Sequence, residues 1–351
     1  MRDSLLSEPL HLTAMDSKVF IKAFAISLIV ANHSGLGALY VSHPVVGGDY
    51  GLHGGLNVLL LLSGITMAQF SFVDTTSNTL RSLRRFALRL FIPSIVIAFL
   101  QGLLIRQQIN IPELLFVSNW LSIHRVSSFP IWYPQAVLQM LLFISIVFYT
   151  FDLTPKIIKH PITLSLYSLA FSLFLALMSY SLWDTSYLQD KLPHLIAWNF
   201  VFGWLYWSLL INQKPTLNAR IVLTTSLFLC AGLTFLMTGA IYGEARFVWF
   251  GLCGAVLIWI EKVWLPRAVY QVFSLISQAT FYIFFMHYYV FSILRVASEH
   301  TGYKFFTMPI FRFLLAIGTS VVVWAFVAAV TRVLQRRNSS PSPRRAGRQG
   351  R

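Results

Sequence analysis

Long apolar segments alternate with short polar stretches along almost the whole chain. Ten such segments are present, at residues 19–42, 52–72, 86–106, 133–151, 161–182, 195–212, 219–240, 244–260, 270–297 and 306–333. A bilayer core of about 30 Å is crossed by about 20 helical residues. The pattern therefore predicts an all-α, polytopic membrane helical bundle of about ten transmembrane helices. Segment 244–260 is the weakest of the ten, and 107–131 is too polar and too interrupted by proline to be an eleventh.

The composition agrees with a membrane protein and divides the chain simply. The 351 residues are 56% hydrophobic and only 11% charged, whereas ordinary soluble domains carry about 25% charged residues. We expect a cytoplasmic N-terminal segment at 1–17, one transmembrane domain at 18–335 and a basic cytoplasmic tail at 336–351. The tail is rich in Ser, Pro and Arg, which predicts disorder.

The basic residues are distributed unevenly between the two sides of the predicted membrane. With both termini in the cytoplasm, all but seven of the 27 Lys and Arg residues fall on the cytoplasmic side. This asymmetry fits the positive-inside rule and predicts an N-in, C-in topology. The formal net charge of +15 therefore reflects topology, and we expect no nucleic-acid partner. For the basic tail, contact with anionic lipid is the alternative to a role in topology. The two cysteines have no metal-ligand spacing, and we expect no metal.

His33 is an ionisable residue within the first apolar segment, where such a group is costly to bury. Lys22 lies eleven residues earlier. On a helix the two residues share a face and stand about 16 Å apart along the axis. A histidine at membrane depth, in line with a cation, is by default a candidate functional residue.

His287 is expected at a depth similar to that of His33. Counted from the cytoplasmic side, the two residues lie about fifteen and seventeen residues into their segments, or roughly 22–26 Å from that face. No Asp or Glu falls in the middle of a predicted span, which argues against proton- or cation-coupled transport and against carboxylate-based catalysis. Histidine accepts a proton near neutral pH. We take both histidines as candidate catalytic residues, with hydrogen-bonded packing as the alternative.

Four arginines gather at the cytoplasmic entry to the third predicted span, namely Arg81, Arg84, Arg85 and Arg89, and Pro93 follows one turn later. Guanidinium groups pair bidentately with phosphate oxygens. Lys22 is expected at the same face of the membrane. These cations therefore suit the phosphates of a nucleotide-bearing cofactor, and the alternative is a role in topology and binding of lipid headgroups.

The outer side carries a different set of polar residues. His53 and Asn57 open the second span there, and we interpret His53 as interfacial. The connection 107–131, with His124 and Arg125, is the longest on this side and is a candidate lid for an acceptor. Its flanking aromatics fit interface anchors, with sugar stacking as a second interpretation; they are Trp120, Trp132 and Tyr133.

Five short motifs follow one another along residues 17–290. They are KAFAISLIVANHSG, GGLNVLLLLSG, RRFALRLFIP, IWYPQAVLQMLLF and ATFYIFFMHYYVF. Their motif positions are occupied by Lys22, His33, Gly55, Asn57, Ser63, Gly64, Arg84, Arg85, Arg89, Trp132, Gln139, Thr280, Phe281, Phe284 and His287. In content and order they resemble the motifs of the acyltransferase-3 family of integral membrane acyltransferases. Members of this family modify surface polysaccharides, peptidoglycan, nodulation factors and antibiotics.

The resemblance implies an O-acyltransferase of a bacterial inner membrane that uses cytosolic acyl-CoA, most commonly acetyl-CoA. The cationic side chains that would hold the donor are Lys22, Arg81, Arg84, Arg85 and Arg89. His33 would act as general base on the acceptor or carry the acyl group, and His287 would orient or polarise the thioester. The acceptor would be a hydroxyl of a surface glycan or lipid-linked glycan precursor, entering near 43–57 and 107–131. The candidate substrate-binding residues are Asn57, Ser63, Trp132 and Gln139.

The chain departs from the family pattern at several positions. Asn57 replaces the usual Asp, Val137 stands where Glu is frequent, and the spacing of the arginines is irregular. An extra hydrolase-like domain, frequent in the family, is not expected here, so transfer would finish within the membrane domain or at its rim. The competing function is a carrier or flippase for an anionic or glycolipid solute. A purely structural membrane partner is disfavoured by the deep histidines.

Overall fold

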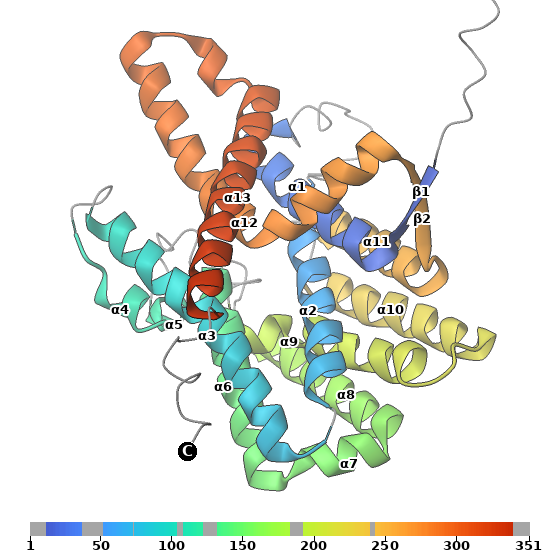
Figure 1. Ribbon diagram of the computed structural model, residues 1–351. Helices are drawn as coiled ribbons and strands as arrows, with labels where there is room; N and C mark the ends of the chain where they lie inside the picture. The colour runs from blue at the N-terminus through green and yellow to red at the C-terminus, as the bar shows by residue number, and fades with distance from the viewer. Residues whose placement is uncertain are drawn as a thin grey trace, which may run out of the picture.

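The computed structural model describes residues 12–36, 52–72, 74–103, 108–121, 132–182, 192–238 and 243–339. Ten helices of fourteen or more residues form the molecule (Figure 1): α1 (Ser17–Ser34), α2 (Gly55–Ser71), α3 (Thr76–Gln101), α6 (Trp132–Phe151), α8 (Pro161–Leu182), α9 (Pro193–Tyr206), α10 (Leu217–Thr238), α11 (Gly243–Trp259), α12 (Arg267–Thr301) and α13 (Pro309–Ser339). Shorter elements link them: α4 (Ile111–Leu114), α5 (Ser118–Leu121), α7 (Leu153–Lys159), the π-helical turn η3 (Trp207–Ile211) that extends α9, and the 3-10 turn η4 (Lys304–Thr307).

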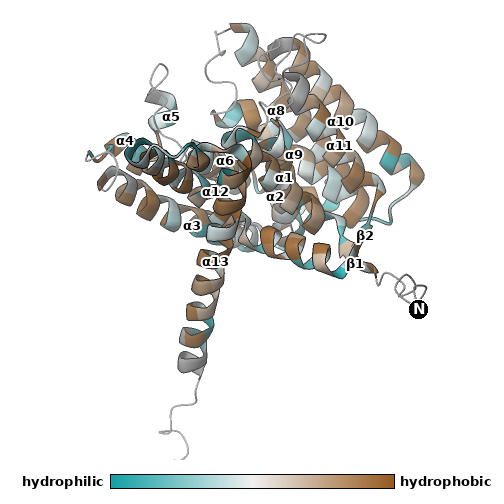
Figure 2. Ribbon diagram, turned by 90° about the horizontal axis from the view of Figure 1, so that it is seen from above, coloured by the Kyte–Doolittle hydropathy of each residue, from teal (hydrophilic) through white to brown (hydrophobic). Residues whose placement is uncertain are grey.

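Each of the ten predicted apolar segments coincides with one of these helices. Six are long and apolar enough to cross a membrane by themselves, namely α6, α8, α9 with η3, α10, α12 and α13. Helix α2 and the apolar part of α11 are shorter, and α1 and α3 carry lysines or arginines. The protein is therefore an integral, multi-pass membrane bundle. Figure 2 shows the apolar residues spread over the outer helices, with α13 projecting from the rest.

Helices α2 and α9 cross in direct backbone contact at the centre of the bundle. A Cβ on Gly64 would lie 1.9 Å from the carbonyl oxygen of Phe200, and one on Gly203 would lie 2.5 Å from the amide nitrogen of Ile65. Small residues allow membrane helices to approach in this way and to gain van der Waals contact. Glycine at these two positions therefore fixes the distance between the helices that hold the core.

A two-stranded antiparallel ribbon joins the beginning of α1 to the beginning of α12. Strand β1 (Leu12–Asp16) pairs with β2 (Lys262–Pro266), with Leu12 opposite Pro266 and Asp16 opposite Lys262. The helical pattern did not predict this ribbon, and it occupies most of the described part of the expected N-terminal segment 1–17. The remaining residues of that segment, 1–11, lie outside the described residues.

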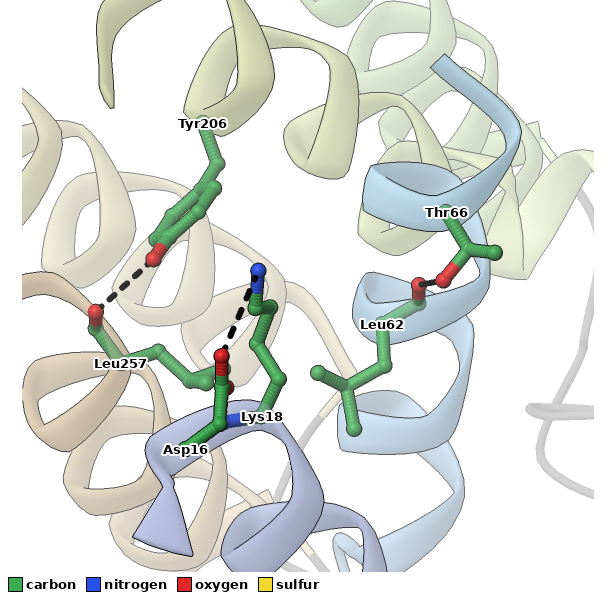
Figure 3. A network of polar contacts seen from close by, with 6 residues as sticks. All are labelled: Asp16, Lys18, Leu62, Thr66, Tyr206 and Leu257. Carbon is green, nitrogen blue, oxygen red and sulfur yellow. Dashed lines mark hydrogen bonds and ion pairs between the residues drawn. The ribbon is translucent and has the colours of Figure 1, made fainter. Parts of the chain in front are cut away.

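Polar contacts fasten α1 beside this ribbon. The carboxylate of Asp16 accepts a hydrogen bond from the backbone N–H of Lys18 at 2.7 Å and forms a 3.9 Å ion pair with its ammonium group (Figure 3). Tyr206 at the end of α9 donates to the carbonyl of Leu257 in α11 at 2.9 Å. Arg220 of α10 pairs with Glu261 at 2.9 Å. Ion pairs and hydrogen bonds thus stabilise the start of α1 and of α10 and the ends of α9 and α11.

Several helix limits differ from the predicted ones. Helix α1 ends at Ser34, because Gly35 adopts a left-handed conformation with φ of 92°, whereas the apolar pattern continues to residue 42; residues 37–42 lie outside the described residues. Helix α3 begins at Thr76, where the side chain of Thr75 caps it, and continues through Pro93. Helix α13 extends to Ser339, so the first residues of the tail expected at 336–351 are helical. From 340 onward that tail lies outside the described residues.

The connection between α3 and α6 contains α4 and α5. Gln139 of α6 anchors this segment, because its side-chain amide bonds with Asn119 and its oxygen accepts the indole N–H of Trp120 at 2.9 Å. Glu113 of α4 is buried and accepts a hydrogen bond from Asn110 at 3.2 Å. Residues 122–131 of the expected lid, including His124 and Arg125, lie outside the described residues.

Candidate functional site

His33 and His287 form a hydrogen-bonded pair between α1 and α12. Nδ1 of His33 lies 3.1 Å from Nε2 of His287, and the two rings are nearly parallel with centroids 5.3 Å apart. His287 is fully buried, whereas His33 is half-buried. The two residues, which were predicted to lie at similar depths, are therefore in contact. His33 belongs to the last turn of α1, and the shorter helix places it at a helix end instead of in mid-helix.

The surroundings of His287 determine which nitrogen carries each proton in the neutral pair. Nδ1 of His287 lies 2.9 Å from the carbonyl oxygen of Ile283, and a carbonyl can only accept, so this nitrogen carries the hydrogen. Nε2 of His287 is then the acceptor, and Nδ1 of His33 donates to it. Nε2 of His33 is consequently left in its basic, lone-pair form. The pair resembles the orienting half of a catalytic triad with a neutral histidine in place of the carboxylate.

Aromatic rings enclose the pair. The Tyr288 ring lies 4.7 Å from that of His33 and 4.1 Å from that of His287. Phe291 packs edge-on against His287 at 5.7 Å, and the guanidinium of Arg312 stands 4.6 Å over the Phe291 ring. The sequence did not identify Tyr288 as a site residue, although it directly follows His287, because aromatic residues are frequent throughout this chain.

A cavity of about 240 Å³ includes in its wall Phe284, whose ring contacts that of His287. Its walls come from α1, α2, α3, α6 and α12, and its polar residues are Lys22, Ser63, Thr66, Tyr133 and Thr280. Lys22 and Ser63 were both predicted as site residues, the first for the donor and the second for substrate. The cavity brings these two together, with the lysine partly buried among mainly apolar lining residues.

Phe284 stands between this cavity and the histidine pair. It lines the cavity, its ring packs against Tyr133 at 5.0 Å, and it meets His287 edge-on at 6.1 Å. The side chain of Tyr133 is hydrogen-bonded to that of Ser63. A ligand arm that fills the cavity would thus reach the histidines past Phe284. Phe284 was noted only as a motif position, since a sequence does not reveal which aromatic residue faces two compartments.

The arginines of α3 lie outside the cavity. Arg81, Arg84, Arg85 and Arg89 are all exposed, whereas Phe86 and Leu90 of the same helix line the cavity. Helix α3 therefore presents a basic face to its surroundings and an apolar face to the cavity. The arginines can contact phosphates only at the surface, outside the cavity that Lys22 lines.

Two asparagine contacts extend the polar part of the core. Asn57 of α2 donates to the side-chain oxygen of Asn199 in α9 at 3.2 Å, and Asn32 lies within 3.4 Å of Nδ1 of His53. Asn199 is almost fully buried and was not predicted, because a single asparagine in an apolar helix gave no spacing to read. Asn57 is thus held by a partner in the core.

The remaining predicted substrate residues lie on α6. Trp132 packs edge-on against Tyr133 at 6.2 Å, which places it next to a cavity residue. Gln139, by contrast, is engaged by the α4–α5 segment and is not among the residues that line the cavity with Lys22. The structure therefore does not bring Gln139 together with the other candidate residues.

Comparison with family models, with curated proteins and with solved structures returns no match for this chain.

Proposed function

We propose that the protein is a membrane O-acyltransferase that moves an acyl group, acetyl by default, from cytosolic acyl-CoA to a hydroxyl of a surface glycan or glycolipid precursor. The observation that carries this proposal is the His33–His287 hydrogen bond, at 3.1 Å, beside a cavity that contains Lys22. The proposal includes membership of the acyltransferase-3 family and a bacterial inner membrane. It also includes ten spans with both termini in the cytoplasm.

The donor would bind with its phosphates at the basic face. Lys22 is within reach of an anion that enters the cavity, and the exposed arginines of α3 would contact the phosphates outside it. The acyl-bearing arm would fill the apolar part of the cavity, where Phe86, Leu90 and Phe284 provide packing surface. On the acceptor side, Asn57 and Trp132 would contact the glycan, and Ser63 the arm.

The reaction then needs one base and one proton donor, and His33 can be both. Its Nε2 takes the proton of the acceptor hydroxyl while the hydroxyl oxygen attacks the thioester carbonyl carbon. The new C–O bond forms, the C–S bond breaks, and the departing thiolate receives the proton from His33. The charge on the transient imidazolium is stabilised through its Nδ1–H, which His287 accepts. An acyl-histidine route, with His33 as nucleophile, uses the same atoms.

The test is transfer of labelled acetyl from acetyl-CoA by the purified protein in lipid vesicles, with mass spectrometry of cell-surface glycans from cells with and without the gene. His33→Ala should lower transfer by about 10³-fold, which is within the usual contribution of a general base. His300→Ala removes an exposed histidine at the far end of α12 and should leave transfer unchanged. Both variants are checked for insertion and for a monodisperse elution profile.

Retained transfer by a folded His33→Ala protein would overturn the proposal. A protein that neither hydrolyses nor transfers acetyl, yet moves a labelled anionic or glycolipid solute across vesicles, would be the carrier considered above. An acetyl-sized mass loss from a glycan in cells without the gene would identify both the acyl group and the acceptor.

A further inference from the structure

A second cavity, of about 420 Å³, lies between α6, α8 and α9. None of its lining residues belongs to α1, α2 or α12, so it is separate from the histidine pair. Ligand sites usually have volumes of about 300–1,000 Å³. This cavity is thus large enough for a ligand of its own.

The walls of this cavity are apolar and one side faces the bilayer. Helix α9 forms the shielded wall through Ala197 and Val201, the second of which is 6% exposed. Phe143 on α6 and Phe171 on α8 form the outer rim and are 55% and 54% exposed. In a membrane-spanning bundle, exposed aromatics at this position contact lipid. The cavity therefore opens sideways, toward hydrocarbon.

One end of the cavity carries side chains that suit a polar headgroup. His194 stands in the first turn of α9, its ring 5.6 Å from that of Trp120, and Trp120 donates to Gln139. Along α9 the cavity continues from His194 to Trp204, or roughly 15 Å at 1.5 Å per residue. That length is about half of the bilayer core, the depth of one leaflet. The shape is that of an amphiphile with its head beside α5.

We propose that this cavity binds an acyl chain of a membrane phospholipid whose polar head lies beside Trp120, Gln139 and His194. Water would find few polar partners among Phe143, Ile144 and their neighbours. An unfilled space of this size would cost the surrounding side chains their dispersion contacts. A hydrocarbon chain restores those contacts, and the bilayer supplies it directly through the open side. The proposal does not depend on acyl transfer.

The test uses a lipid that crosslinks to whatever its chain touches. The full-length protein is reconstituted into phosphatidylcholine vesicles that contain a small fraction of a phospholipid with a diazirine on its acyl chain. A second preparation contains a diazirine-bearing isoprenyl phosphate. After irradiation, labelled peptides are identified by mass spectrometry. Val201 on the cavity wall is only 6% exposed, so label on this residue that matches or exceeds the label on lipid-facing α13 reports a chain inside the cavity.

Cavity-filling variants make the experiment decisive. Ala197→Phe should lower labelling of α9 by about tenfold, because a close-packed interior leaves no room for both ring and chain. Leu142→Phe is the matched control: Leu142 is on α6, is 64% exposed and does not line the cavity. It should change neither the α9 label nor the α13 label. Ser168→Leu, which enters from α8, serves as a second filling variant should Ala197→Phe not fold.

Strong α9 labelling by the phospholipid probe supports the proposal. Labelling of α9 no stronger than background with that probe, or labelling by the isoprenyl phosphate alone, would overturn it. So would equal α9 labelling in the wild type and in a folded cavity-filling variant.

Discussion

The two cavities share α6 as a wall but are otherwise lined by residues of different helices. The smaller one is lined by residues of five helices, among them Lys22, and Phe284 in its wall contacts His287. The larger one opens between α6 and α8, and hydrocarbon side chains dominate its lining. Lys22, a partly buried cation, lines the smaller cavity and not the larger one, in keeping with the high cost of a charged side chain that faces lipid. The larger cavity offers apolar packing along most of its length, with Trp120, Gln139 and His194 at its polar end.

The strongest test of this contrast removes the partner of His33 while preserving its shape. His287→Phe keeps a ring among Phe284, Tyr288 and Phe291 but removes the acceptor for Nδ1–H of His33. We expect kcat for acetyl transfer to fall by about 10²- to 10³-fold, with lipid labelling of α9 unchanged. Transfer kinetics and crosslinking on the same preparation provide both readouts. Full activity in the variant would show that His33 does not need His287 to orient it.

Removal of the cation from the enclosed cavity should act on donor binding. Lys22→Met keeps the apolar stem, so we expect KM for acetyl-CoA to rise by about tenfold with a smaller change in kcat, as for loss of a ground-state contact. Lys18→Met is the control, because Lys18 pairs with Asp16 and lies outside the cavity. The measurement is KM for acetyl-CoA from steady-state kinetics on both variants. Equal KM values for the two variants would contradict a donor role for Lys22.

The exposed arginines should contribute less than Lys22 and in a salt-dependent manner. Arg84→Gln with Arg85→Gln should raise KM for acetyl-CoA by about threefold at low salt, and the difference should shrink at high salt, because exposed charges are screened. Arg267→Gln removes an exposed charge at the start of α12 as a control. A salt-independent effect, or the same effect in the control, would count against phosphate binding by α3.

The smallest effect is expected when the open cavity is filled. Ala197→Phe should leave hydrolysis of acetyl-CoA within about twofold of the wild type, because the cavity shares no lining residue with the enclosed one and distant sites behave independently. The measurement is thiol release in the absence of acceptor. A large loss in a folded variant would mean that the two cavities are coupled through α6.

The sequence predicted where the described helices lie. Each of the ten apolar segments contains a described helix, because a long run of apolar residues has few alternatives in a membrane. The depth count predicted that His33 and His287 would lie level, and they touch. It also predicted a cation on the side of α1 that faces the site, and Lys22 lines the cavity.

Features that depend on distant contacts were not predictable. Strand β1 has only five residues, and its partner β2 lies some 250 residues later, so no local pattern predicts the pair. The end of α1 depends on the conformation of Gly35, whereas hydropathy alone continues past it. The second cavity lies between α6, α8 and α9. The sequence of each of these helices, taken alone, predicts only an ordinary membrane span.

The separation of 254 positions between His33 and His287 also determines when the pair can form during biosynthesis. Ribosomes add about 5–20 residues per second, so α12 emerges on the order of 10–50 s after α1. During that interval the nascent chain has inserted its first helices but does not yet possess the pair. The pair, and any activity that depends on it, can therefore arise only after α12 has been made and inserted.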